Sequence, residues 1–238
     1  MSEIRPYFRQ LLSGRDFASN DPLAQSMANN IYLIGDLETR ECLVVDPAYR
    51  IGEILTLAAK DEMKVVGALV SHYHADHIGG SMMGHTIEGL STLLETNDVP
   101  VHANVEELAW ISRTTGLSIN ELTGHHDGDT VQVGRLTINL VHTPGHTPGS
   151  QCFYVHGALI SGDTLFLDGC GRTDLPGSKT EDMYYSLQKI ASLPDQTVIF
   201  PGHRYSEHPF GDLGTIKAHN HVFRPQSVEQ WMQWFGTN

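Results

Sequence analysis

The chain has 238 residues, of which 40% are hydrophobic, and this length supports one sizeable core. Its formal net charge is −13, with only 15 Lys and Arg against 28 Asp and Glu. This balance argues against nucleic-acid binding, because affinity for a phosphate backbone comes from clustered cations.

Strands and one helix are predicted ahead of the first polar cluster. Residues 1–29 are expected to form an irregular arm or a first edge strand. Residues 30–35 and 42–47 are apolar runs on either side of a turn-like segment, which predicts a hairpin. Residues 51–62 have apolar side chains at helical spacing, and residues 65–70 form a β-branched run typical of a buried strand.

Four side chains that can bind a metal follow that strand within six residues: His72, His74, Asp76 and His77. In the sequence S-H-Y-H-A-D-H-I, an extended backbone would place His72 and His74 on the same side. A polar loop that only caps the strand is the weaker interpretation of this spacing. Imidazole together with carboxylate suits zinc or iron better than magnesium or calcium, so the cluster predicts a site for one or two such ions.

The next elements are less regular. Residues 81–97 carry apolar side chains that predict an amphipathic helix. Asn104, with Glu107 three residues on, resembles a capping box and predicts a helix that runs through Trp110. Residues 114–127 show little periodicity, and we expect them to form a lid or a pocket wall.

The C-terminal half predicts two hairpins and two helices. The hairpins cover residues 131–140 and 151–160, each around a Gly-containing turn. A helix is expected over 180–193, with Thr180 as its N-cap, and a short one over 228–235.

Three more ligand-type residues follow apolar strands in this half. His146 lies in the turn sequence H-T-P-G-H-T-P-G, Asp163 comes just past an apolar run, and His203 follows V-I-F-P-G. For any one of these three residues taken alone, a structural role would be a better interpretation than metal binding. Sites are commonly built on loops at strand ends, so together with the first cluster they predict one shared metal site.

Composition and termini also predict where the protein works. Three cysteines give no disulfide framework, which favours a reducing compartment. The N-terminus has no apolar signal core, and no run approaches the ~18 apolar residues of a membrane span. We therefore expect a cytoplasmic protein that binds no membrane. We also expect a monomer or homodimer, with a small molecule as its substrate.

The four motifs together resemble the metallo-β-lactamase-fold superfamily. H-x-H-x-D-H, G-H-T-P-G, G-D-T and P-G-H occur in its order over residues 30–225. The resemblance implies an α/β (α+β) four-layer αββα sandwich, as one domain over 1–238 with an N-terminal arm at 1–29 and a short C-terminal tail at 204–238. It also implies seven ligands: His72, His74 and His146 for one metal, Asp76, His77 and His203 for a second, and Asp163 as the bridge.

The resemblance implies a hydrolase with two divalent ions, zinc being the expected metal and iron possible. Two cations lower the pKa of a shared water towards neutrality, and this needs no Ser or Cys nucleophile. Asp76 is then either a ligand only, or also the group that orients the water or takes its proton.

Residues 162–174 narrow the resemblance to two thiol enzymes. G-D-T-L-F-x-x-G-C-G-R resembles glyoxalase II, the hydroxyacylglutathione thioesterase, and G-C-G-R-T-D resembles the persulfide dioxygenases. Arg172 would then hold a substrate carboxylate, or else form an ion pair with Asp174 or Asp168. Tyr205 matches H-x-Y in both relatives and would bind near the metal, or else pack locally. Cys170 is expected to be a packing residue.

Three reactions stay open at this stage. The favoured one is hydrolysis of a small-thiol thioester. The second is persulfide oxidation at a single iron(II), with His72, His146 and Asp163 as ligands, and the third is a lactonase or esterase. Only the 35 residues of the tail follow His203, although glyoxalase II draws basic glutathione-binding residues from that region, so the thiol carrier also stays open.

Overall fold

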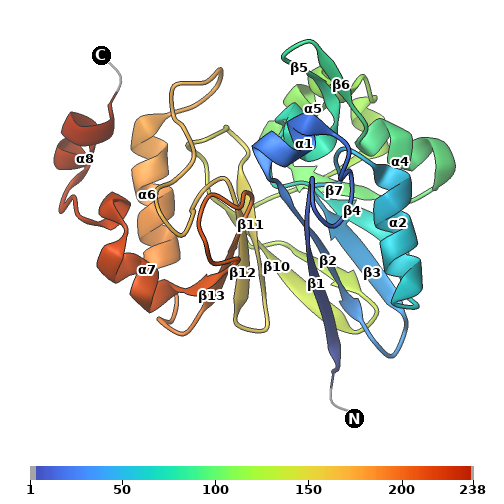
Figure 1. Ribbon diagram of the computed structural model, residues 1–238. Coiled ribbons are helices and arrows are strands. Elements are labelled where there is room, and N and C mark those ends of the chain that lie inside the picture. Colours follow the sequence, from blue (N-terminus) through green and yellow to red (C-terminus); the bar gives the residue numbers. More distant parts are fainter. Residues whose placement is uncertain (1–3, 237–238) are drawn as a thin grey trace.

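The computed structural model describes residues 4–236 and contains two six-stranded sheets that face each other (Figure 1). The first has the strand order β1 (Pro6–Leu12), β2 (Asn30–Asp36), β3 (Glu41–Val45), β4 (Lys64–Leu69), β7 (Val101–Asn104) and β8 (Leu122–His125). The second has the order β14 (Gly211–Asp212), β13 (Val198–Pro201), β12 (Ala158–Gly162), β11 (Gln151–Val155), β10 (Leu136–His142) and β9 (Thr130–Val133).

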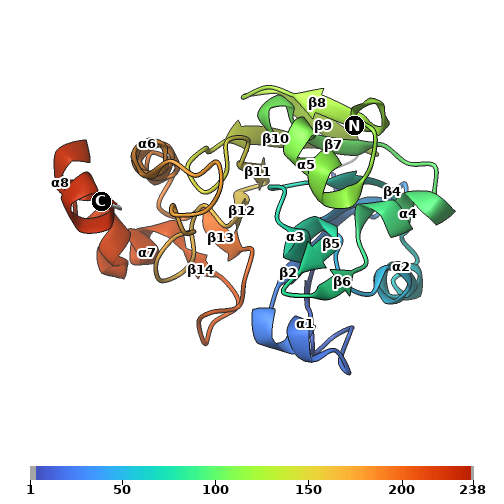
Figure 2. The same cartoon turned by 90° about the horizontal axis from the view of Figure 1, so that it is seen from above.

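Helices cover the outer face of each sheet and complete four layers (Figure 2). The first sheet is covered by α2 (Ile51–Lys60), α4 (Leu90–Thr96) and α5 (Leu108–Thr115), and the second by α6 (Thr180–Ala191) and α7 (Leu213–His219). The last helix, α8 (Val228–Phe235), packs against α6. The chain therefore folds as the αββα sandwich that the sequence predicted.

Strand β2 shows why the layers hold together. Successive side chains of a strand point to opposite faces, and in β2 both faces are apolar. Ile31 and Leu33 belong to the cluster under the helices of the first sheet, whereas Tyr32 and Ile34 belong to the cluster between the sheets. Both sides of the first sheet are therefore buried, so its strands stay fixed at the edge where the site lies.

Most predicted elements are confirmed, namely both C-terminal hairpins, the β2–β3 hairpin, α2, β4, α6 and α8. Residues 1–29 contain the predicted edge strand β1, and also a helix, α1 (Pro22–Met27), that Asp21 caps. Thr180 is the first residue of α6 and not its N-cap, because the extended residue before the helix is Lys179; the Thr180 hydroxyl donates to Thr173 Oγ1 at 2.9 Å.

The helix predicted over 81–97 is wrong in its first half. Residues 80–87 form a hairpin of β5 (Gly80–Met82) and β6 (His85–Ile87), and helix α4 begins only at Leu90. The backbone gives the reason, because Met83 and Gly84 both have positive φ and close a two-residue turn. Residues 114–127, which we expected to be a lid or pocket wall, contain strand β8, and Thr114 does line the main cavity.

Within residues 4–236, no helix has the length and apolar character needed to cross a membrane.

Candidate metal centre

The predicted ligands come together at one edge of the sandwich, where the two sheets meet. The loop after β4 carries the H-x-H-x-D-H residues, and within it α3 (Ala75–Ile78) carries Asp76 and His77. His146 comes from the β10–β11 turn, Asp163 follows β12, and His203 follows β13. Because β12 and β13 are parallel, their carboxyl ends lie at the same edge and place Asp163 beside His203.

Among the described residues, ligand-type atoms gather in three groups of three; one consists of Asp46, His72 and His77, and the other two match the predicted metal positions. His72, His74 and His146 offer nitrogen atoms that all lie within 4.8 Å of one another, and so do the ligand atoms of Asp76, His77 and His203. All of these residues except His74 are buried.

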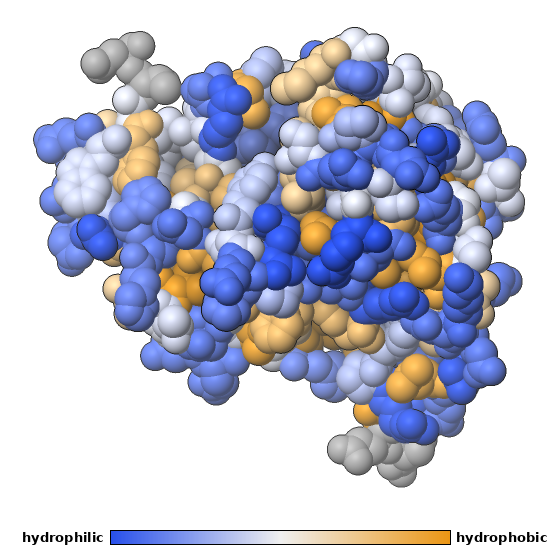
Figure 3. Space-filling model, in the orientation of Figure 1, coloured by the Kyte–Doolittle hydropathy of each residue, from blue (hydrophilic) through white to orange (hydrophobic). Residues whose placement is uncertain are grey.

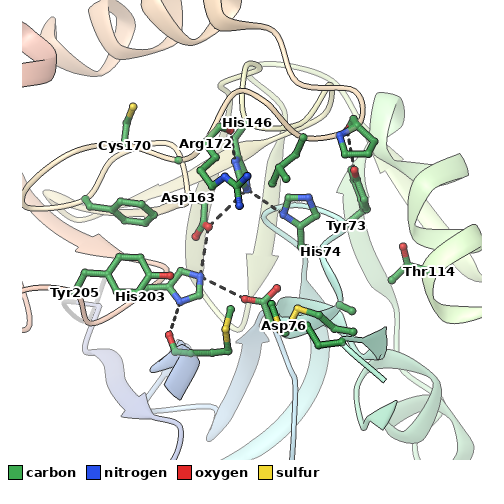
Figure 4. A pocket seen from close by; sticks show the side chains of 18 of the residues that line it. Tyr73, His74, Asp76, Thr114, His146, Asp163, Cys170, Arg172, His203 and Tyr205 are labelled. Atoms are coloured by element: carbon green, nitrogen blue, oxygen red, sulfur yellow. Dashed lines mark hydrogen bonds and ion pairs between the residues drawn. The ribbon is translucent and has the colours of Figure 1, made fainter. Parts of the chain in front are cut away.

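Asp163 lies between the two groups (Figure 4). Its Oδ2 is 3.6 Å from His146 Nε2 and 3.4 Å from His203 Nε2, and its Oδ1 is 3.4 Å from His77 Nε2. A side chain at position 202 would collide with Asp163 Oδ1, so only glycine fits before His203. One carboxylate thus faces both candidate metal positions.

Hydrogen bonds on the far side of each ring fix its orientation. His146 Nδ1 donates to the carbonyl of Arg172 and His203 Nδ1 to that of Met27, both at 2.8 Å. His77 Nδ1 lies 3.0 Å from Asp46 Oδ2. In a neutral imidazole that donates through Nδ1, Nε2 carries a lone pair, so each of the three rings can present Nε2 to a metal when the ring is neutral.

The donor set fits divalent cations. His77 Nε2 and His203 Nε2 face each other at 3.1 Å, and His146 Nε2 faces His74 Nδ1 at 3.0 Å. His72 Nε2 and Asp163 Oδ1 are buried with no hydrogen-bond partner in the described structure. Such orphaned atoms are costly in a protein interior, and a metal ion would satisfy both of them.

Electrostatics shape the metal-free centre. Burial opposes a charge on His77, but Asp76, Asp163 and Asp46 raise the pKa of its ring to about 10. Burial also opposes the charge of Asp163, yet the neighbouring histidines hold the pKa of that carboxyl well below its usual range. The carboxylates therefore stay ionised, and His77 carries a compensating proton until a metal replaces it.

Two supporting residues escaped the sequence analysis, and the first is Asp46. Its carboxylate accepts from Ser71 N at 2.7 Å and Ser71 Oγ at 2.5 Å, besides facing His77. Such a carboxylate behind a metal-binding histidine orients the ring and raises its basicity. The signal was available, because Asp46 follows an apolar strand just as Asp163 does.

The second is Glu107, which the sequence analysis named only as part of a capping-box-like helix start. Asn104 does cap, accepting from Glu106 N, but Glu107 is 1% exposed and points inward. Its carboxylate accepts from Tyr73 N at 2.8 Å, Thr147 Oγ1 at 2.7 Å and Gly149 N at 2.7 Å. Glu107 therefore ties the loop of His72 and His74 to the turn of His146.

A cavity of about 750 Å³ opens above the centre and is lined by His74, Asp76, His146, Asp163 and His203 among others. Arg172 lines it too, but its guanidinium pairs with Asp174 through contacts of 2.9 and 2.8 Å.

Two more predicted residues line this cavity. The ring of Tyr205 stacks on His203, with centroids 4.7 Å apart, and Tyr205 is 58% exposed. Burial raises the pKa of the Cys170 thiol to about 12, which suits a packing residue and not a nucleophile.

Comparison with known proteins identifies the family of this chain. Residues 26–203 match the family model described as the metallo-beta-lactamase superfamily, and the chain belongs to that superfamily. The match spans the first cluster, the β10–β11 turn, Asp163 and His203.

The similar proteins include both thiol enzymes. The chain is 33% identical to a hydroxyacylglutathione hydrolase of Aeromonas hydrophila, over 82% of this chain and 69% of the relative. It is 32% identical to the mitochondrial persulfide dioxygenase ETHE1 of Bos taurus, over 73% of this chain and 63% of the relative. The crystal structure of ETHE1 from Myxococcus xanthus superposes with a TM-score of 0.78 at 27% identity, covering 96% of this chain and 89% of that one.

Proposed function

We propose that the protein is a metal-dependent hydrolase that cleaves a thioester of a small thiol. One observation carries the proposal: two groups of oriented ligand atoms share Asp163 at the base of an open cavity. The similarity to a hydroxyacylglutathione hydrolase supports the thioester as substrate.

His72, His74 and His146 would hold the first metal, and Asp76, His77 and His203 the second, with Asp163 between them. When bound, two divalent cations, zinc in this proposal, would lower the pKa of a shared water towards neutrality and polarise a substrate carbonyl. The water oxygen adds to the acyl carbon, the carbon–sulfur bond breaks, and the departing thiolate takes the proton that the water releases. The products are a carboxylic acid and a thiol.

Asp76 is the side chain placed to manage that proton. Asn29 Nδ2 donates to its Oδ2 at 3.0 Å, and the Asn29 amide is itself held by the Tyr49 hydroxyl at 2.9 Å. The Asp76 carboxylate is thus fixed at the cavity floor, where it can orient a water or accept its proton besides binding the second metal. Arg172 and Tyr205, on the cavity wall, would contact the substrate.

A second candidate reaction is persulfide oxidation at one iron(II). His72, His146 and Asp163 supply a two-histidine, one-carboxylate set of the kind that non-haem iron oxygenases use. The similarity to ETHE1 proteins in sequence and structure favours it. A lactonase or esterase, which would use the same activated water, is the third.

Metal content separates the first two reactions. The protein should be purified anaerobically without added metal, and its metals counted by mass spectrometry while oxygen uptake is followed with glutathione persulfide. Near two zinc ions per chain without oxygen uptake supports the hydrolase, and a screen of thioesters against lactones then separates the third. About one iron per chain with persulfide-dependent oxygen consumption would overturn the hydrolase.

We further propose a cytoplasmic monomer or homodimer that works on a small molecule. The −13 charge supports the absence of a nucleic-acid partner.

A further inference from the structure

The turn of the β5–β6 hairpin contains a residue that such turns disfavour. Met83 and Gly84, with φ of 51° and 79°, are the two central residues of the turn that joins Met82 to His85. Turns with two left-handed residues favour Asn, Asp or Gly at both positions, because a larger side chain is strained there. Met83 is nevertheless present, and 80% of it is exposed.

Folding gives no reason for this methionine. The preceding Met82 packs partly against the core under the helices of the first sheet, which anchors the hairpin. The β5–β6 hairpin lies at the top of the view in Figure 1. Met83, at its turn, lines the cavity above the metal centre. In Figure 3 most of this face is hydrophilic, with apolar side chains exposed over the hairpin. Local strain that packing does not explain is typical of binding sites.

The other walls of the cavity are apolar as well. Met27 and Met82 line it on the side of the first sheet, and Phe166, Leu175 and Pro176 on the side of the second. Methionine is flexible and polarisable, so it adapts to apolar groups of different shape. The volume of about 750 Å³ lies in the usual range for sites of small organic ligands.

The charges around the cavity do not suit an anionic carrier. Among the described residues that line it, Arg172 is the one Lys or Arg, and Asp174 already neutralises its guanidinium. Asp168 adds a negative charge at the rim. Of the ionisable side chains in the C-terminal tail, His221 lies 3.5 Å from this Asp168 carboxylate, whereas Lys217 pairs with Asp195 outside the cavity lining. A thiol with two carboxylates, such as glutathione, would have to break the Arg172–Asp174 pair and would still leave one carboxylate unpaired.

We propose that the hairpin methionines and the wall around Leu175 form a subsite for an apolar acyl chain, so that the substrate is a fatty or similarly apolar acyl thioester of a carrier without clustered negative charge. This inference rests on the proposed thioesterase function. It makes Met83 a specificity-determining residue, because its side chain lines the same cavity as the candidate metal ligands.

The test is an acyl-chain series on the metal-loaded enzyme. Acetyl, butyryl, hexanoyl and octanoyl thioesters of N-acetylcysteamine, a neutral thiol, are compared by kcat/KM with the same acyl groups on glutathione. Burial of each methylene is worth about fourfold, so kcat/KM should rise steeply with chain length on the neutral carrier. Equal rates for acetyl and octanoyl, or a preference of about tenfold or more for glutathione, would overturn the inference.

Met83→Gly is the informative variant, since glycine is the residue this backbone favours and folding should not suffer. Loss of contact with roughly two methylenes should reduce the octanoyl-to-acetyl ratio about sixteenfold. Ile119→Asn, which removes an exposed apolar side chain outside the cavity, is the matched control and should keep the wild-type ratio. An unchanged ratio in Met83→Gly would refute the role of Met83.

A binding measurement with ligands that cannot be cleaved tests the apolar subsite independently of the proposed thioesterase function. S-alkyl N-acetylcysteamine thioethers, which cannot be hydrolysed, are titrated by calorimetry into the wild type and Met83→Gly. If no thioester is cleaved but Kd still falls with alkyl length in the wild type only, the apolar subsite stands and the thioesterase proposal fails. If thioesters are cleaved with no dependence on chain length in either protein, the reverse holds.

Discussion

Glu107→Gln should weaken the first metal position and spare the second. All three partners of Glu107 are donors, namely Tyr73 N, Thr147 Oγ1 and Gly149 N, and the carboxylate accepts from all of them. Glutamine replaces one of these oxygens with an NH₂ group, which then points at a donor. Leaving a buried donor unsatisfied costs about 1–3 kcal/mol.

That cost falls on the three histidines of the first group. Tyr73 lies between His72 and His74 in the chain, and Thr147 directly follows His146, so both ligand loops lose a common anchor. Loss of a residue that orients ligands typically lowers metal affinity about 10–100-fold. The second group depends on other anchors, since Asp46 orients His77 and the carbonyl of Met27 orients His203.

The assay is a chelator competition that reports the affinity of each metal per chain. Glu107→Gln should lose one ion at a chelator concentration that leaves the wild type with two, and keep the other ion at wild-type affinity. Glu106→Gln changes the exposed neighbour in the same way and should behave like the wild type. Two ions bound with unchanged affinity in Glu107→Gln would refute the anchoring argument, and equal weakening of both positions would show a general structural defect.

Three more predictions concern protons, stability and the cavity rim. Zinc binding at pH 7 should release about one proton per chain from His77, because the ring's pKa of about 10 keeps it charged before the metal binds. Calorimetry in buffers of different ionisation enthalpy measures this proton release. No release would show that the His77 ring is neutral. Asp36→Asn should lower Tm at neutral pH by about 2–4 °C or more, because hydrogen bonds from Arg135 hold the pKa of the buried Asp36 carboxyl well below that of the unfolded chain. That stabilisation is present above the unfolded pKa and is lost as pH falls through the folded pKa, so the Tm difference should shrink in acid, and a constant difference would contradict the assignment. Asp174→Asn should free Arg172 and lower KM for thioesters that bear a carboxylate about tenfold relative to neutral ones, and an unchanged KM ratio would show that Arg172 does not contact the substrate.

The positions of the ligand-type residues could be predicted from the sequence because each lies just after an apolar run. Asp163 and His203 each follow a short apolar run that predicts a strand, and the parallel pairing of β12 and β13 brings strand ends to one edge. This pattern indicates a location but not a role, so the assignment of each ligand to a metal stays a prediction. The same pattern would also have found Asp46 at the end of β3.

Glu107 was misjudged because a local pattern and a long-range one compete for the same residue. Its spacing from Asn104 fits a capping box, but the donors it meets belong to Tyr73 and Thr147, which are 34 and 40 positions away. The sequence around Glu107 does not show that the donors of the His72–His74 loop and of the His146 turn need an acceptor. Residues 81–97 failed differently, since Ile87 and Leu90 are buried whether that segment is a strand followed by a helix or one helix. Periodicity over so short a run cannot separate the two.

Some of the residues that violate local preferences lie around this centre. Among the described residues, eight that are not glycine have positive φ, and three of them, Asp46, Tyr49 and Met83, lie around the centre. Asp46 orients His77, and Tyr49 holds the Asn29 amide that fixes Asp76. Each conformation costs energy that the fold must offset elsewhere. For Asp46 and Tyr49 the compensation is visible, because both side chains are buried and hydrogen-bonded. Met83 has no such compensation in the described structure, being exposed at a hairpin tip, so the missing stabilisation is best supplied by a bound apolar group. Met83→Gly should therefore raise Tm in the free protein and weaken octyl thioether binding, whereas a residue retained for folding would lower Tm when replaced.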